Sequence, residues 1–199
     1  TTVGYTTGSM LDQMKYNLKN TGSFSGSYVG NWNPGYSGNK PLGGYADTNL
    51  NPVTTLSTAS AHFYLTLRNS IIENGTEIGN DDSAFIVGGF STSGLLDMPT
   101  TTDRISLSIS PTINNKGNYL VMLNSNSRKV LRNQVNVGQA GPATTNFGSS
   151  TIKIASGKFS NSSKENAFAT IGDGLTDYEA KALYWIVQKY QTTLGRQVY

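Results

Sequence analysis

A capped helix near the C-terminus is the strongest local signal in the chain. Thr176 and Glu179 form a Thr-x-x-Glu capping box, in which the Thr176 hydroxyl accepts from the Glu179 amide and the Glu179 carboxylate accepts from the Thr176 amide. Asp177 adds negative charge at the positive end of the helix dipole. Gly195 supplies a stop. We therefore predict a helix over 176–194.

Apolar residues recur along this helix at helical spacing and predict one buried stripe. They are Leu175, Ala182, Leu183, Ile186, Tyr190 and Leu194. Tyr184 and Trp185 are expected to be packing residues as well. A helix of this kind needs an apolar surface to cover, and the rest of the chain must provide it.

The composition of the whole chain is that of a turn-rich β protein. The 199 residues include 22 Gly, 11 Tyr and no Cys, and only 14% are charged. Without Cys there is no disulfide framework and no thiolate metal site. The net charge of +3 is scattered, so we expect no nucleic-acid partner. No run approaches the roughly 20 apolar residues of a membrane span.

Short strands separated by turn signals fill the middle of the chain. The clearest is 61–68, where Ala61, Phe63 and Leu65 alternate with polar residues. Asn74-Gly75 predicts a hairpin turn between strands at 70–73 and 76–78. Other strands are expected near Tyr28 and at 84–87, 104–110, 119–123, 128–131, 151–155 and 165–170, with a loop over 138–149. About ten strands at this spacing predict an all-β fold, an antiparallel jelly-roll β-sandwich with one C-terminal α-helix packed on it. We assign 1–22 to an N-terminal arm or linker and 23–199 to the sandwich domain.

The region around the helix resembles a known family. The residues that carry the resemblance are AFATIGDGLTDYEA at 167–180, Leu183-Tyr184, Val187-Gln188 and QTTLGR at 191–196. They are similar to the closing signature of the concanavalin A-like (laminin G-like) jelly-roll domains in structural proteins of tailed bacteriophages. Weaker similarity extends upstream through His62-Phe63-Tyr64 and 43–52 to about Tyr16, while Arg132-Asn133-Gln134 stands where a Gly-containing turn is expected.

This resemblance implies a non-catalytic module on the virion surface, in a tail fibre, tail tip or capsid decoration. The expected partners are other virion proteins, further copies of the chain, and glycans of cells or the environment. An alternative is a purely architectural decoration protein that makes protein–protein contacts only. A shared sandwich does not decide between them.

A carbohydrate site would need aromatic platforms beside polar amides, because sugar faces stack on rings while hydroxyls form hydrogen bonds. Trp32, Tyr36 and Tyr45 lie in segments of suitable composition and are the candidate ligand-binding residues. The competing interpretation is that these rings fill space between a loop and the sandwich.

Metal binding and catalysis have weaker support. Asp81 and Asp82 could hold Ca²⁺ through oxygen ligands, although the loop shows no recognised ligand spacing; no other cofactor is expected. Sandwich glucanases carry a Glu-x-Asp-x-x-Glu strand, and its absence from this sequence argues against hydrolysis. A glycoside hydrolase that uses Glu73 and Glu77 is therefore kept only as the second alternative. His62, the single histidine, is expected on a sheet face rather than in a catalytic site.

Overall fold

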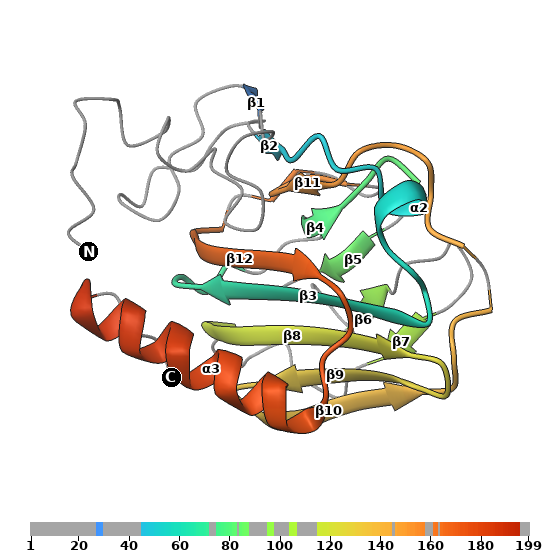
Figure 1. Cartoon of the computed structure of the whole chain (residues 1–199). Helices are drawn as coiled ribbons and strands as arrows, with labels where there is room; N and C mark the ends of the chain where they lie inside the picture. The colour runs from blue at the N-terminus through green and yellow to red at the C-terminus, as the bar shows by residue number, and fades with distance from the viewer. Residues whose placement is uncertain are drawn as a thin grey trace, which may run out of the picture.

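The fold is a β-sandwich with a long C-terminal helix (Figure 1). The computed structural model describes residues 27–29, 45–71, 75–82, 84–87, 95–97, 104–106, 115–144, 146–157, 161–162 and 164–195. The predicted all-β class with one helix on the sandwich is confirmed. The proposed boundary between an arm and the domain, at 22–23, lies outside the described residues.

Two five-stranded sheets form the sandwich, and the strands paired within each sheet are antiparallel. Sheet A has the order β1 (Ser27–Val29), β2 (Tyr45–Asp47), β11 (Lys153–Ile154), β4 (Thr76–Gly79) and β5 (Ala84–Val87). Sheet B has the order β10 (Val135–Ala140), β9 (Arg128–Arg132), β8 (Gly117–Asn124), β3 (Ser60–Leu67) and β12 (Asn166–Gly172). A separate pair is formed by β6 (Leu95–Asp97) and β7 (Arg104–Ser106), and the short helix α2 spans Pro52–Thr55.

Sheet B is covered on both faces, which explains why its central strands are buried almost throughout. The alternation predicted for β3 is confirmed: Phe63 and Leu65 belong to the core cluster shared with sheet A. The Phe63 ring stacks on Phe85 of β5, with ring centroids 4.4 Å apart. The intervening Tyr64 belongs instead to a second apolar cluster beneath the C-terminal helix. The molecule therefore has three layers: sheet A, sheet B and the helix.

The C-terminal helix, α3 (Asp177–Thr193), begins and ends as its sequence predicts. Both hydrogen bonds of the capping box are present: the Glu179 amide donates to Thr176 Oγ1 at 3.2 Å, and the Thr176 amide donates to Glu179 Oε2 at 2.8 Å. Gly195 has a φ of 64°, a left-handed conformation that favours glycine and ends the helix. These contacts are local, so a short stretch of sequence determines them.

The face that α3 buries differs from the predicted stripe. Ala180 and Val187 pack on the outer face of sheet B, and Gln188 and Gln191 are buried with them, while Leu175 and Leu183 are half-buried there. Ile186, Tyr190 and Leu194 are exposed, so this part of the prediction was wrong. The reason is that 180, 187 and 191 form an equally regular helical row, and this row is the one that meets the apolar side chains of Tyr64, Leu120 and Met122 on sheet B.

Two strand predictions also need correction. Ser70 and Ile71 lie outside any strand, and β4 pairs with β5 and β11. Within the described residues, the segment before the Asn74-Gly75 turn therefore does not form a hairpin with β4. Strand β10 begins at Val135 and runs into the region predicted as a loop. Residues 72–73 of the predicted strand 70–73, Asn74 of the predicted turn and residues 107–110 of the predicted strand 104–110 lie outside the described ranges.

The connection from β12 to α3 is held against β3 by close contacts. His62 Nδ1 lies 2.6 Å from the Asp173 carbonyl oxygen, and since a carbonyl only accepts, Nδ1 carries the proton. His62 Nε2 then accepts from Thr170 Oγ1 at 3.1 Å. A Cβ on Gly174 would lie 2.9 Å from Ser60 Oγ and 3.1 Å from the Leu123 carbonyl oxygen, so any other residue here has to displace its neighbours. His62 thus has a structural role on the sheet face, as predicted.

Candidate functional site

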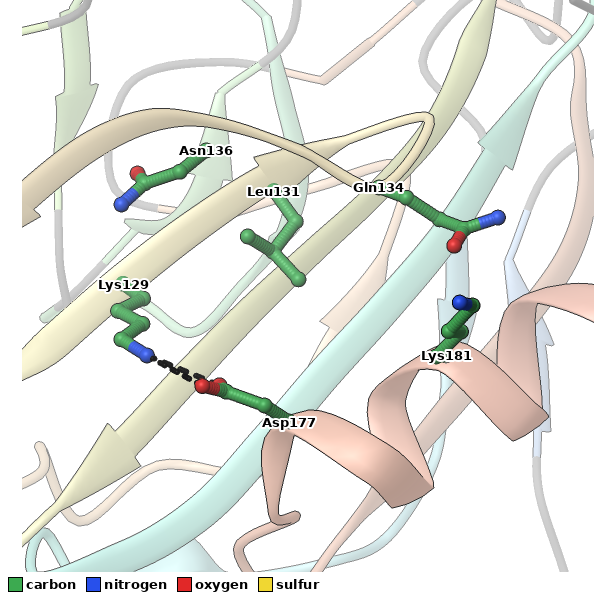
Figure 2. A pocket seen from close by; sticks show the side chains of 6 residues that line it. All are labelled: Lys129, Leu131, Gln134, Asn136, Asp177 and Lys181. Atoms are coloured by element: carbon green, nitrogen blue, oxygen red, sulfur yellow. Dashed lines mark hydrogen bonds and ion pairs between the residues drawn. The ribbon is translucent and has the colours of Figure 1, made fainter.

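A polar groove of about 250 Å³ lies between α3 and the β9–β10 hairpin. Its lining residues are Lys129, Leu131, Gln134, Asn136, Asp177 and Lys181. Figure 2 shows Leu131 at the floor between the hairpin and the helix, with the polar side chains around it. We call this feature the helix–hairpin groove.

The groove arises because sheet and helix place residues from distant parts of the sequence together. On β9, Lys129 and Leu131 share the outer face of sheet B, while Val130 between them points into the sandwich core. On α3, Asp177 and Lys181 are four residues apart and therefore neighbours on one side of the helix. The sequence offers no motif that links these two pairs.

The charges in the groove leave one cation exposed. Lys129 Nζ lies 2.9 Å from both carboxylate oxygens of Asp177, which neutralises this pair (Figure 2). In the described part of the chain, Lys181 forms no ion pair or side-chain hydrogen bond. Two lysines and one aspartate give the groove a net charge of +1.

Gln134 occupies an unusual backbone position at the end of the groove. It and Asn133 form the two-residue turn between β9 and β10, and their φ values are 70° and 47°, both positive as a type I′ turn requires. A left-handed conformation without glycine costs roughly 1–2 kcal/mol. This also answers the expectation of a Gly-containing turn here: the turn forms with Asn133 and Gln134 instead.

The groove continues into a small space beneath α3. This space has a volume of about 10 Å³, near the smallest that holds one water, and Gln134 and Leu131 line both it and the groove. At its inner end the Tyr64 hydroxyl donates to Asn118 Oδ1 at 2.8 Å. Burial raises the pKa of the Tyr64 hydroxyl, which therefore stays a neutral hydrogen-bonding group.

Two aromatic residues that neighbour Lys181 on α3 are exposed, although neither lines the groove itself. Tyr178 is 82% exposed and Trp185 is 58% exposed. Trp185 also contacts Tyr184 edge-on, with centroids 5.3 Å apart, which restricts its ring. Lys181 lies three residues after Tyr178 and four before Trp185, so both rings neighbour its side chain on the helix surface. The prediction that Trp185 is a packing residue was therefore wrong.

The aromatic residues predicted to bind a ligand do not contribute to this groove as far as they are described. Trp32 and Tyr36 lie outside the described residues. Tyr45 belongs to β2 in sheet A, where the Lys153 ammonium lies 5.1 Å from its ring centroid. The groove, by contrast, is on the outer face of sheet B, so Tyr45 remains a separate candidate.

The predicted calcium ligands are exposed and already have protein partners. Lys153 Nζ lies 2.5 Å from Asp81 Oδ1, and the Ser150 hydroxyl donates to Asp82 Oδ2 at 3.4 Å. Desolvation by itself would lower the pKa of Lys153, but the hydrogen bond and charge of Asp81, together with the charges of Tyr45 and Asp47, outweigh it and raise the pKa above its ordinary value. Within the described ranges no group of three or more His, Asp or Glu side chains is arranged to hold a metal ion. Calcium binding here stays a prediction.

Glu77, a residue of the hydrolase alternative, is completely buried. Its Oε1 lies 2.9 Å from Lys164 Nζ and accepts from the Ser162 hydroxyl at 2.7 Å, and Lys164 is also fully buried. A polysaccharide on the surface cannot reach this carboxylate in the structure. Glu73 lies outside the described residues.

Comparison with known proteins supports the fold. No protein-family model matches the chain, and no curated protein matches its sequence. Among solved structures it is similar to the binding domain of botulinum neurotoxin DC in complex with SialylT, with a TM-score of 0.53, 15% identity, and coverage of 84% of this chain and 47% of that chain. The botulinum neurotoxin serotype C1 binding domain gives a TM-score of 0.50 and 15% identity, over 82% of this chain and 48% of that chain.

The chain thus spans about half the length of these structures and shares a β-sandwich fold with them. At 15% identity the likeness concerns the fold alone. Among the helices of the described residues, none has the length and apolar character needed to cross a membrane.

Proposed function

We propose that this protein is a non-catalytic glycan-binding module displayed on the surface of a bacteriophage virion, in a tail fibre, tail tip or capsid decoration. The observation that carries the binding role is the helix–hairpin groove with the exposed rings of Tyr178 and Trp185 beside it. The virion role rests on the resemblance of 167–196 to phage jelly-roll domains.

The groove offers the chemistry that a sugar needs. A ring such as that of Trp185 stacks on the apolar face of a pyranose, while the amides of Gln134 and Asn136 form hydrogen bonds with its hydroxyls. Leu131 provides an apolar floor between them. Because both walls belong to secondary structure elements, little of the site has to be ordered on binding.

A structural neighbour supports the same role. The botulinum neurotoxin DC binding domain, solved in complex with SialylT, has a sandwich of related fold. Its ligand is a property of that protein, and here it only motivates a search among glycans.

A glycan array followed by calorimetry on the best ligand tests the proposal. Trp185→Ala should weaken binding about five- to thirtyfold, since stacking on an aromatic side chain contributes on the order of 1–2 kcal/mol. Leu194→Ala is the matched control, because Leu194 is exposed on the same helix more than two turns away. Binding that survives Trp185→Ala unchanged would place the site elsewhere.

Gln134→Gly separates binding from folding. Glycine adopts a φ of 70° without strain, which offsets its greater freedom in the unfolded chain, so the free energy of unfolding should change by less than about 1 kcal/mol. The variant nevertheless lacks the amide that lines the groove. We expect an unchanged melting temperature and weaker glycan binding. Full binding by this variant would remove Gln134 from the site.

The architectural alternative is favoured by one observation, the exposed apolar side chains of α3. Trp185 and Ile186 are both more than half exposed and would also suit a protein partner. No binding to any sugar, together with firm binding to a capsid or tail protein, would support that alternative. Release of reducing ends from a polysaccharide would contradict the non-catalytic role.

A further inference from the structure

We propose that the helix–hairpin groove selects anionic glycans, with the ligand's carboxylate or sulfate bound by the Lys181 ammonium; this rests on the proposed glycan-binding function. The ligand class follows from the net positive charge of the groove and from its hydrogen-bond donors, because a neutral sugar makes no use of the charge.

The groove contains two ammonium groups, and one of them is paired with a carboxylate. Lys129 is held by Asp177 through two contacts of 2.9 Å, so this pair attracts an anion weakly. Asp177 is also occupied by that contact, and its negative charge is balanced. Lys181, one helical turn further along, has no carboxylate partner among the described residues. Its charge therefore remains available to a ligand.

The side-chain amides of Gln134 and Asn136 bring hydrogen-bond donors to the groove. Asn136 Oδ1 accepts from the Gly138 amide at 3.1 Å, and Asn136 Nδ2 donates to Gln139 Oε1 at 3.3 Å, which orients the amide and leaves one Nδ2 hydrogen for a ligand. The Gln134 amide has no hydrogen-bond partner among the described residues. Figure 2 shows the Gln134 and Lys181 side chains facing each other at one end of the groove.

Gln134 and Lys181 lie close enough to the same end of the groove to contact one substituent of a ligand. An anionic substituent between Gln134 and Lys181 receives a charge-assisted hydrogen bond from the ammonium. It receives a neutral one from Gln134 Nε2 once the amide, whose oxygen faces Lys181 in Figure 2, turns its nitrogen toward the ligand. The sugar that carries the substituent then lies beside Tyr178 or Trp185, the exposed neighbours of Lys181 on the helix. Charge selects the ligand, and the rings bind its apolar face.

The experiment compares glycans that differ only in charge. The probes are 3′-sialyllactose and trigalacturonate, each against its methyl ester, with a heparin tetrasaccharide as the sulfated probe; a mixed array of acidic and neutral glycans accompanies them. Wild-type protein should bind the acidic member of a pair about two- to fivefold more tightly, the factor expected for an exposed pair of opposite charges. Binding should also weaken several-fold when NaCl rises from about 50 to 300 mM, because the pair is exposed.

Lys181→Gln should bring the ratio of acidic to neutral affinity down to about one, because it removes the ammonium that binds the anion. Lys189→Gln is the matched control, since it makes the same change of charge on the same helix, about 12 Å further along its axis. Trp185→Ala should weaken acidic and neutral ligands alike. Carboxylated and sulfated probes distinguish the two sources of the anion, and preference for either supports the inference.

Three results would overturn the inference. Equal binding of acidic and neutral members would contradict it while leaving the glycan-binding function intact. If Lys181→Gln keeps the preference for acidic glycans, the selectivity belongs to another site. If Lys189→Gln loses that preference as fully as Lys181→Gln does, the selectivity comes from the net charge of the protein. Absence of binding to every array glycan would reject both the inference and the proposed function.

Discussion

Replacing Lys164 by methionine should destabilise the protein by about 3–5 kcal/mol, the range found when one partner of a buried ion pair is removed. Lys164 and Glu77 are both fully buried, with Nζ and Oε1 2.9 Å apart. Methionine fills a similar volume but leaves the Glu77 carboxylate in the protein interior without its ammonium partner. For a domain of this size the loss corresponds to a fall in melting temperature of roughly 6–20 °C.

The double variant Glu77→Leu/Lys164→Met provides the comparison. Replacing both charges by apolar groups removes the penalty of an uncompensated buried ion, so the double variant should lie within about 2 kcal/mol of wild type. Part of that difference, about 1 kcal/mol, comes from the Ser162 hydroxyl, which loses the acceptor that it contacts at 2.7 Å. The double variant should therefore be more stable than Lys164→Met alone.

Urea unfolding monitored by circular dichroism measures these differences, with the exposed Lys189→Met as control. A loss below about 1 kcal/mol for Lys164→Met would refute the reasoning. So would a double variant whose loss equals the sum of the two single losses, because the residues would then not be coupled. The prediction also bears on function: Glu77 is assigned a structural role, and Glu77→Gln should reduce stability rather than a hydrolase activity.

Three further predictions concern the sheet B side of the molecule. Asn118→Ala should cost about 2–4 kcal/mol in urea unfolding, because the buried hydroxyls of Tyr64 and Thr66 both donate to Asn118 Oδ1, at 2.8 and 2.7 Å, and would lose their acceptor; an effect below 1 kcal/mol would contradict this. Gly174→Ala should lower stability by about 1–3 kcal/mol, since its Cβ would lie 3.1 Å from the Leu123 carbonyl oxygen, whereas Gly141→Ala, with open space around it, should not. Burial lowers the pKa of His62 below its usual 6.5, so stability should be complete above about pH 6.5 and fall as the pH drops below it; His62→Gln should flatten this part of the stability–pH curve, and an unchanged curve would exclude His62 as its source.

Much of the fold follows from local sequence. The capping box of Thr176 and Glu179 involves residues three apart, and Gly195 ends the helix through its own backbone conformation. The alternation of 61–67 predicts strand β3 because a strand exposes successive residues to opposite faces. Interactions within a few residues do not depend on the rest of the chain, so they can be predicted without it.

The candidate site could not be predicted in this way. Lys129 and Asp177 are 48 residues apart, and no spacing rule connects a hairpin with the first turn of a distant helix. The prediction of Trp32 and Tyr36 rests on the loop composition around them, and both lie outside the described residues. The sequence does carry the aromatic pair Tyr184-Trp185, but on an amphipathic helix such a pair indicates packing as readily as binding.

The sequence by itself thus determined that this protein has a capped C-terminal helix and an all-β body, since propensity, capping and alternation are local properties. Only the tertiary structure decided which side of the helix is buried. Two rows of residues have suitable helical spacing, and the row with Ala180 and Val187 is the one that packs closely on sheet B. That choice leaves Trp185 exposed and brings Lys181 to the groove, because burial depends on the surface that a helix meets and not on its own periodicity.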